Sequence, residues 1–363
     1  MSTVESKPAV YATVSALDAG HITLRDALYV TGADPDAYTT VPSLSFLIRH
    51  PSPPASRNGN TTNVVFDLGV KRNISDYAPG LRQSLAQMGL ITTQPDCSAS
   101  LRHGAVDSSN DNDREDRTEK KELLTPEQDV DFVILSHVHW DHIGTPSDFA
   151  RATFVVGSGS LQLLKHGAAP YNPPDEFNAD ELPLSRTVEL PLAHDFKGGD
   201  EGEFREYYAG TQTPAPTRTP TSIDALPGAG VGGQTLAWRP FAGFPAAIDF
   251  FGDGSVYIID CPGHIYGHIN LLVRTAPAKY VYLGADCCHD NRILTGERDF
   301  AEYEDKQGRI RSAHVHTRLA RESLRRINES VGSLRRDADV EIIIAHDKAW
   351  RERNRSRFWP GTF

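Results

Sequence analysis

The chain has 363 residues, of which 39% are hydrophobic, and it carries a formal net charge of −11 at pH 7. A chain of this length can bury a large hydrophobic core, and we expect one domain spanning residues 1–363. The acidic balance argues against a general affinity for nucleic acid or for an anionic membrane surface, because both require a cationic face on the protein.

The cysteines and the apolar segments indicate a cellular compartment. The four cysteines, Cys97, Cys261, Cys287 and Cys288, show no paired spacing, so no disulfide framework is predicted, as in a reducing environment. Residues 1–13 lack the apolar stretch of a secretion signal, and no segment has the roughly 18 uncharged apolar residues of a membrane helix. We therefore expect a soluble cytoplasmic protein.

The first part of the chain is expected to be rich in strands. Short apolar runs within residues 10–49 are typical of strands, and residues 51–63, which are polar and rich in Pro, Asn and Ser, are expected to form a hairpin loop. Residues 64–69 then predict a strand, near whose end lies Asp67. This aspartate is either a turn or cap residue or a carboxylate that orients a metal-bound histidine. Residues 77–90 have helical spacing of apolar side chains.

The composition changes sharply at residues 92–121, which are polar and highly charged. Because such a segment has little apolar surface to offset its ordering entropy, we expect an exposed insertion there. Residues 201–234, dominated by Thr, Pro and Gly, are expected to form a second loop-like insertion, which either covers a pocket or decorates the surface.

Between these insertions, the apolar run 130–135 leads into the sequence SHVHWDH. His137 and His139 are two residues apart at the end of an expected strand, so they can point to the same side. Asp141 and His142 lie where the chain turns toward a helix and can point in a second direction. A single histidine at a strand end is commonly a surface or hydrogen-bonded residue, but four ligand-type side chains in six positions indicate metal binding. The arrangement suits two neighbouring ions.

Three later apolar runs, each expected to be a strand, deliver further ligand types at their ends. These are residues 255–260, followed by a Pro/Gly-rich loop with His264 and His268; residues 280–286, ending in Asp286; and residues 340–347, containing His346. Side chains at the ends of neighbouring strands can converge in one cleft, so these residues are candidates for the same site.

The pattern His-x-His-x-Asp-His, followed by Pro-Gly-His-x-x-Gly-His, Gly-Ala-Asp and a strand-end His, resembles the metallo-β-lactamase superfamily. The resemblance runs in motif order from about residue 63 to residue 347 and includes the element Asp67-x-Gly69. It implies an α/β fold, a four-layer αββα sandwich in which two mixed sheets face each other and the metals lie at one edge. The segments 92–121 and 201–234 would be insertions into this fold.

Carried over residue by residue, the resemblance implies that His137, His139 and His268 hold one metal ion. Asp141, His142 and His346 would hold the second ion, and Asp286 would bridge the two. His264 would be a structural residue or one that orients a ligand. Zinc is the expected metal, with iron, manganese or cobalt as alternatives for such nitrogen and oxygen ligands. Two such ions activate a shared water as a nucleophile, which Asp141 could orient or deprotonate.

Within the superfamily, the seven-ligand set is most similar to that of N-acyl-homoserine-lactone lactonases and related fungal lactone or lactam hydrolases. Those bacterial lactonases carry a tyrosine three residues after the bridging aspartate, and this chain has His289 there, which either donates to the substrate carbonyl or is an unrelated surface residue. Trp140 and Tyr266 either line the substrate pocket or only pack. The remaining histidines, among them His314 and His316 on an expected helix, are assigned to structure or surface.

We therefore predict a dinuclear metal-dependent hydrolase that opens a lactone or cyclic amide of a small metabolite or xenobiotic. A glyoxalase II-like thioester hydrolase shares the same ligands, and a mononuclear iron persulfide dioxygenase reuses part of them; the complete set favours the dinuclear hydrolase. The acidic balance disfavours a nuclease or phosphodiesterase, and the complete ligand set disfavours a binding module without catalysis.

Overall fold

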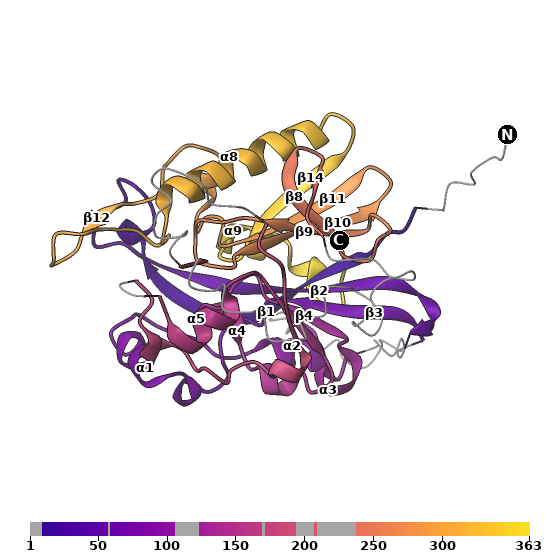
Figure 1. The fold of residues 1–363 in the computed structure, drawn as a ribbon, viewed down its shortest axis with the longest axis horizontal. Helices are drawn as coiled ribbons and strands as arrows, with labels where there is room; N and C mark the ends of the chain where they lie inside the picture. Colours follow the sequence, from indigo (N-terminus) through magenta and orange to yellow (C-terminus); the bar gives the residue numbers. More distant parts are fainter. Residues whose placement is uncertain (1–8, 57–58, 106–122, 169–170, 194–206, 209–236) are drawn as a thin grey trace, which may run out of the picture.

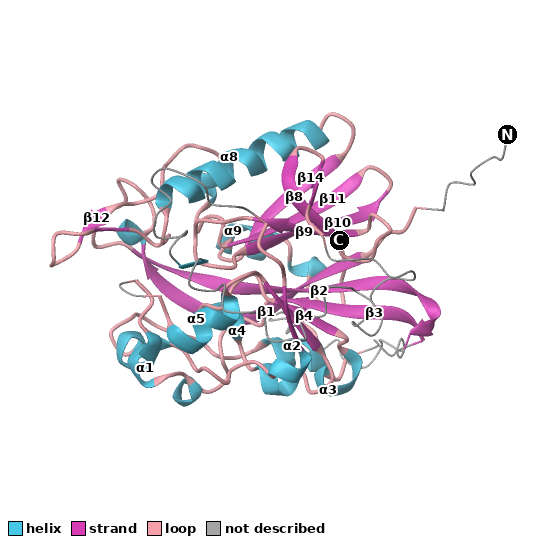
Figure 2. Ribbon diagram, in the orientation of Figure 1, coloured by secondary structure: helices cyan, strands magenta, loops and turns pink. Residues whose placement is uncertain are grey.

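The computed structural model describes residues 9–56, 59–105, 123–168, 171–193, 207–208 and 237–363 of the chain. Two six-stranded sheets face each other at its centre, and helices cover the outer faces of the sheets (Figures 1 and 2). This arrangement is an αββα sandwich, which confirms the fold class expected from the sequence.

The first sheet combines an antiparallel part with a parallel part. In sheet order its strands are β1 (Thr13–Arg25), β2 (Tyr38–Ser56), β3 (Gly59–Phe66), β4 (Phe132–Ile134), β5 (Thr153–Val156) and β6 (Thr187–Glu189). The strands β1 to β3 pair antiparallel, whereas β3 to β6 pair in parallel. Because parallel strands end at the same edge, the segments that follow β3 and β4 leave the sheet together.

The second sheet is mixed as well. In sheet order its strands are β14 (Asp339–Ile344), β11 (Lys279–Ala285), β10 (Ile269–Ala276), β9 (Val256–Asp260), β8 (Phe244–Asp249) and β7 (Arg239–Phe241). Only the β11–β14 pair is parallel, and the other pairs are antiparallel. Asp286 directly follows β11, and His346 follows β14 by one residue, so both side chains leave at the same edge of this sheet.

The helices are short except for α8. They are α1 (Pro79–Leu85), α2 (Cys97–His103), α3 (Pro126–Asp129), α4 (Trp140–Ile143), α5 (Ser160–His166), α7 (Asn291–Leu294), α8 (Thr317–Leu334) and α9 (Lys348–Arg353), and a small hairpin of β12 (Tyr303–Glu304) and β13 (Ile310–Arg311) precedes α8. None of the helices in the described part of the chain has the length and apolar character required to cross a lipid bilayer.

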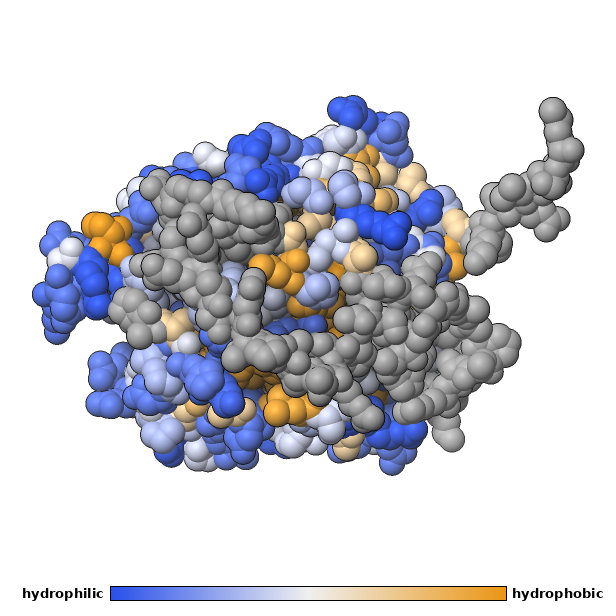
Figure 3. Space-filling view, viewed as in Figure 1, coloured by the Kyte–Doolittle hydropathy of each residue, from blue (hydrophilic) through white to orange (hydrophobic). Residues whose placement is uncertain are grey.

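Helix α8 forms because its apolar side chains follow the helical period. Ala320, Leu324, Ile327 and Val331 recur every three or four residues and are buried against the second sheet's side of the molecule. The surface over α8 in Figure 3 is largely hydrophilic, as expected for the solvent side of an amphipathic helix.

The main core lies between the two sheets. Phe132 of β4 and Phe250, which follows β8, are both fully buried, with ring centroids 5.4 Å apart in an edge-to-face arrangement. Apolar residues from both inner faces surround this pair. Dense packing between the sheets holds the strands rigidly and therefore fixes the positions of the side chains at the strand ends.

Two expectations about loops are wrong. Residues 51–63 do not form a loop throughout, because β2 and β3 continue through most of this segment. Residues 97–103, expected in an exposed insertion, form α2, whose Leu101 is buried and whose first turn is capped by Asp96 accepting from Ala99 N. Residues 106–122 lie outside the described residues, and in the second expected insertion only 207–208 are described.

Candidate metal centre

The histidine segment 136–142 leaves the first sheet after β4 and turns into α4. It lies directly against residues 67–69, which follow β3, and Leu68 N donates to His142 O at 2.8 Å. Gly144 has a φ of +49°, and a Cβ there would lie 2.4 Å from Leu68 O. Only glycine fits this close contact, which holds the two segments together at the sheet edge.

Asp67 is buried and holds the histidine segment through three contacts. Its Oδ1 accepts from Ser136 N (2.7 Å), and its Oδ2 accepts from Ser136 Oγ (2.7 Å) and from His142 Nδ1 (2.8 Å). The proton on His142 is thereby placed on Nδ1, which leaves the Nε2 lone pair free to face the opposite direction. These are the contacts that an orienting carboxylate makes.

A first group of ligand-type atoms joins the histidine segment to the second sheet. His139 Nδ1 lies 2.9 Å from both His137 Nε2 and His264 Nε2, and His137 Nε2 lies 3.2 Å from His264 Nε2. Asp286 Oδ2 lies 3.3 Å from His264 Nε2. The four ligand atoms are all within 4.8 Å of one another. Three imidazole nitrogens and one carboxylate oxygen converging in this way match the tetrahedral donor set of a zinc-type ion.

A second group lies on the other side of Asp286. It consists of Asp141, His142 and His346, and His346 Nε2 is 3.6 Å from Asp141 Oδ2. Asp286 Oδ1 lies 3.3 Å from His142 Nε2 and 3.2 Å from His346 Nε2. The carboxylate of Asp286 thus directs one oxygen at each group, which is the arrangement required to bridge two ions.

Several buried atoms that face this centre lack a hydrogen-bond partner, as expected for atoms that coordinate a metal. His142 Nε2, His346 Nε2 and Asp286 Oδ1 are buried and make no hydrogen bond among the described residues. On its other side, His346 Nδ1 is hydrogen bonded to Pro42 O at 2.8 Å. Buried polar atoms without partners are costly, and metal coordination would satisfy them.

Three side chains at the centre, Asp286, His139 and His264, are held in the ionisation state that binds metals. Burial alone would raise the pKa of Asp286, but the imidazoles of His142 and His346 outweigh it and hold this pKa well below its usual range. Burial lowers the pKa of His139 to about 4 and lowers that of His264 well below its ordinary value. These two imidazoles are therefore neutral at pH 7, which is the form that binds metals.

Asp67→Asn is expected to weaken binding of the ion held by His142 by ~10–100-fold, because the amide is a weaker acceptor for Nδ1–H and no longer fixes the ring. Competition with a chelator measures this, and the thermal midpoint of the metal-free variant serves as the control for folding. An unchanged metal affinity would show that Asp67 only caps the turn.

The geometry corrects the prediction for the two histidines of the loop after β9. His268, predicted as a ligand, has its Nδ1 hydrogen bonded to Cys261 O at 2.8 Å and belongs to no ligand group in the described part of the chain. His264, predicted to lie outside the ligand set, faces the first group instead. Gly263 (φ +129°) makes the turn that places it there, and a Cβ at this glycine would lie 2.3 Å from Ala320 N. The loop therefore packs tightly on α8.

His289 lies beside the metal centre and is not a surface residue. This is the location required if it donates a hydrogen bond to the substrate carbonyl. Its Nε2 is 3.1 Å from Asp286 Oδ2, and its ring stacks on that of His346 with centroids 5.5 Å apart. The ring of Tyr29 contacts it from another side, at 4.7 Å. His289 lines the pocket that opens over the metal centre.

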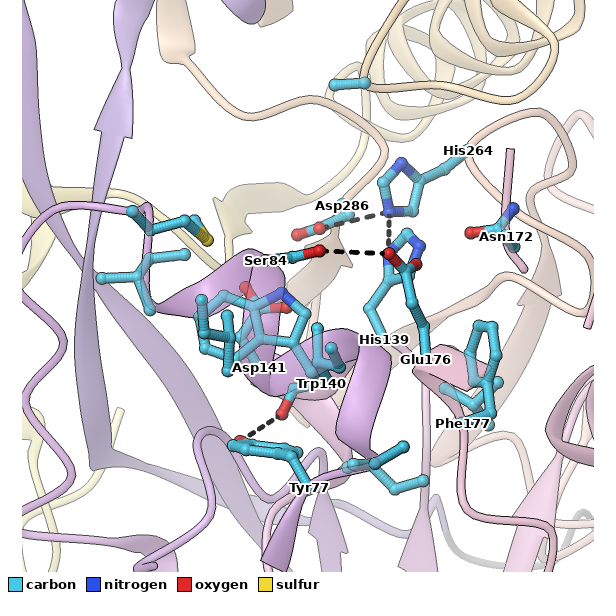
Figure 4. A pocket seen from close by; sticks show the side chains of 18 of the residues that line it. Tyr77, Ser84, His139, Trp140, Asp141, Asn172, Glu176, Phe177, His264 and Asp286 are labelled. Atoms are coloured by element: carbon cyan, nitrogen blue, oxygen red, sulfur yellow. Dashed lines mark hydrogen bonds and ion pairs between the residues drawn. The ribbon is translucent and has the colours of Figure 1, made fainter. Parts of the chain in front are cut away.

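This pocket has a volume of about 260 Å³. Its floor is formed by the ligand-type residues His139, Asp141, His264, Asp286 and His346. Its wall is formed by aromatic and aliphatic side chains, among them Tyr29, Tyr77, Leu81, Leu85, Met88, Trp140 and Phe177. Figure 4 shows Trp140, Tyr77 and Phe177 around this space, with His139, His264 and Asp286 grouped at one side. The site therefore combines a polar floor with an apolar wall.

The two aromatic residues predicted to contact substrate have different positions. Trp140 lines the pocket, and its backbone oxygen accepts from Tyr77 Oη at 2.7 Å. Tyr266 is not among the residues that line the pocket, so the substrate-contact prediction is wrong for it. Its ring stacks on Tyr207 with centroids 3.7 Å apart and packs in the core beside Tyr208, which is the packing alternative.

Sequence reasoning missed His314. It was expected on a helix and at the surface or in a structural role, but α8 begins only at Thr317, and His314 is 3% exposed. Its ring lies 4.9 Å from that of His264 and 5.3 Å from that of His289. No local pattern signals this position, because only the tertiary packing of α8 on the His264 loop creates it.

Comparisons with known proteins point to one superfamily. A family model described as the metallo-β-lactamase superfamily matches residues 106–231. The metallo-hydrolase mfmC of Annulohypoxylon moriforme is 27% identical over 255 residues, which are 70% of this chain and 50% of that protein. The gamma-lactamase FDB1 of Fusarium pseudograminearum is 26% identical over 254 residues, 68% of this chain and 45% of that protein. The chain spans at most about half the length of the curated relatives it matches, and 23% of mpaDE, a monooxygenase of Penicillium brevicompactum.

Solved structures show the same fold over nearly the whole chain. AiiA of B. thuringiensis, a variant with N-decanoyl-L-homoserine bound at its active site, aligns with a TM-score of 0.57 and 15% identity and covers 98% of this chain and 100% of its own. An N-acyl homoserine lactone hydrolase with its product at the catalytic metal centre aligns with a TM-score of 0.56, 15% identity and the same coverage. At such identities the likeness is one of fold.

Proposed function

We propose that this chain, which belongs to the metallo-β-lactamase superfamily, is a dinuclear metal-dependent hydrolase that opens the ring of a lactone or a cyclic amide. The observation that carries the proposal is the placement of Asp286, whose two oxygens face two separate groups of ligand-type side chains. Among the relatives, the name of a gamma-lactamase supports the ring-opening reaction, and the name of a metallo-hydrolase supports metal-dependent hydrolysis.

In this proposal each ion has its own set of protein ligands. One ion is held by His137, His139 and His264, the other by Asp141, His142 and His346, and Asp286 contacts both. Zinc is the proposed metal, because it accepts imidazole and carboxylate ligands in small coordination sets. When bound, the two ions supply a hydroxide nucleophile at neutral pH and polarise the scissile carbonyl.

The side chains around the ions have separate tasks. Asp141 is buried beside the second group, and its carboxylate can orient the nucleophile and accept its proton. His289 lines the same pocket on the side of Asp286, so its imidazole can donate a hydrogen bond to the substrate carbonyl oxygen as negative charge develops there. The apolar wall keeps bulk water away from these groups and so strengthens their electrostatic effect.

The size of the pocket favours a small substrate. Its volume of about 260 Å³ is below the range of ~300–1,000 Å³ that is common for pockets of drug-sized ligands. A small ring with a carbonyl group can be held between the aromatic wall and the metal floor. A thioester of a peptide-like thiol, the substrate of the glyoxalase II-like alternative, needs more room.

The test is a hydrolysis panel of small lactones, lactams, cyclic carbamates, thioesters and phosphodiesters, run on metal-loaded protein with and without a chelator. We expect ring opening of a lactone or a cyclic amide that the chelator abolishes. Thioester turnover far above that of both ring classes would overturn the proposed reaction, and one iron per chain without zinc would favour the dioxygenase.

His289→Phe is expected to lower kcat on the order of 10²-fold while KM and the metal content stay close to the parent values, because it removes a donor that acts mainly in the transition state. His289→Tyr should recover part of kcat, since the phenol restores a donor at the position where the resembling lactonases have tyrosine. Steady-state kinetics together with metal analysis decide this. A rise in KM alone would assign His289 to ground-state binding.

A further inference from the structure

His314 is a buried imidazole to which the proposed reaction gives no task. It lies in the loop between β13 and α8 and is 3% exposed, and neither of its ring nitrogens makes a hydrogen bond among the described residues. The free-energy cost of burying a polar ring without partners calls for a compensating interaction. The surroundings of His314 indicate what that interaction is.

The loop that contains His314 is hydrogen bonded through its backbone to the loop that contains His264. Val315 N donates to His264 O at 2.8 Å, and His316 N donates to Gly263 O at 2.9 Å. One ring nitrogen from each of His264, His289 and His314 lies within 4.8 Å of the other two. Since His264 Nδ1 and both ring nitrogens of His314 make no direct hydrogen bond among the described residues, this spacing corresponds to one bridging water.

His264 lacks the outer contact that its neighbours have. Among the proposed ligands, the Nδ1 atoms of His137, His142 and His346 are hydrogen bonded to Ser136 Oγ (2.9 Å), Asp67 Oδ2 (2.8 Å) and Pro42 O (2.8 Å), respectively. The Nδ1 of His264 is buried and has no such partner in the described part of the chain. A histidine that binds metal through Nε2 carries its proton on Nδ1, and that N–H normally donates to a neighbouring acceptor.

We propose that His314 is a positioning residue that accepts the Nδ1–H of His264 through one bridging water and thereby keeps the Nε2 lone pair of His264 directed at the first ion. The inference rests on the proposed function insofar as that function makes His264 a ligand.

The substitutions His314→Gln and His314→Met separate this role from simple packing. The two new side chains have similar length and flexibility, but only glutamine offers an oxygen acceptor. Chelator competition should show that His314→Met lowers the affinity of one of the two sites for Zn²⁺ by ~10–100-fold and leaves the affinity of the other site unchanged. His314→Gln should retain most of the affinity at both sites. In ¹⁵N-histidine spectra, the Nδ1–H signal of His264 should persist in His314→Gln and be lost or shifted in His314→Met.

His50→Met is the matched control for removal of a buried imidazole. His50 is hydrogen bonded to Asp253 at 2.8 Å and belongs to no ligand group, so this variant should bind both ions as the parent does. If His314→Met does not fold, His314→Phe replaces it as the apolar variant.

Three results would overturn the proposal. Unchanged affinities in the apolar variant would show that His264 needs no acceptor there, and equal losses in the glutamine and apolar variants would assign His314 to packing. If the parent protein bound three metal ions and the His314 variants bound two, His314 would itself be a ligand. Because the measurement uses no substrate, a negative hydrolysis panel would refute the proposed reaction without deciding the role of His314.

Discussion

Asp286→Asn is expected to lower metal-dependent kcat/KM on the order of 10³-fold or more, because it removes the charge that both ions share. Bound metal should fall from two ions per chain to about one. The amide retains the shape of the carboxylate, but it presents only one oxygen. Its NH₂ group cannot coordinate an ion, and it faces imidazole nitrogens whose lone pairs are directed at the metal. Asp286 Oδ1 lies 3.2 Å from His346 Nε2, so the disturbed contacts are direct.

Metal analysis and far-UV circular dichroism on the same preparation separate loss of the site from loss of the fold. Asp305→Asn is the control, because this aspartate accepts hydrogen bonds from Gln307 N and Arg309 N in the turn between β12 and β13 and belongs to no ligand group. Full activity and two ions in Asp286→Asn would show that the bridging assignment is wrong.

The sequence predicted the two-metal pattern because each ligand type follows an apolar strand. The runs before His137, Asp286 and His346 become β4, β11 and β14, whose cores are buried on both faces and therefore leave a clear hydrophobic signal. Parallel pairing then brings the strand ends to one edge, which is a consequence of topology rather than of any single side chain.

Features that depend on tertiary contacts left no such signal. Helix α2 forms in a polar stretch because Cys97 and Leu101 find buried positions and Asp96 caps its start, which composition alone does not reveal. The location of Tyr266 in the core depends on Tyr207, which lies far away in the sequence. His314 reaches the metal loop only because α8 packs against Gly263.

The choice between His264 and His268 depends on backbone geometry that residue types do not encode. Both histidines lie in the same Pro/Gly-rich loop and both are buried. His264 follows the left-handed turn at Gly263 and faces the ligand group, whereas His268 immediately precedes β10 with its Nδ1 on Cys261 O. The resemblance to the superfamily pointed to His268, and the geometry points to His264.

The same substitution at both positions decides between these assignments. Asparagine has an amide N–H close to the position of histidine Nδ1–H, but it has no atom at the position of Nε2. His264→Asn should therefore lose one ion and lower kcat/KM on the order of 10³-fold, because the lost atom is the proposed ligand. His268→Asn should keep both ions and most of the activity, since it can still donate to Cys261 O.

Metal analysis and steady-state kinetics on the two variants, prepared under the same conditions, give the comparison. The reverse pattern, with loss of an ion in His268→Asn alone, would restore the assignment made from the sequence. It would also remove the basis for a positioning role of His314, because that role requires the Nε2 of His264 to face the metal. The pair of variants thus tests which of the two histidines completes the first ion's ligands and whether the loop on α8 supports it.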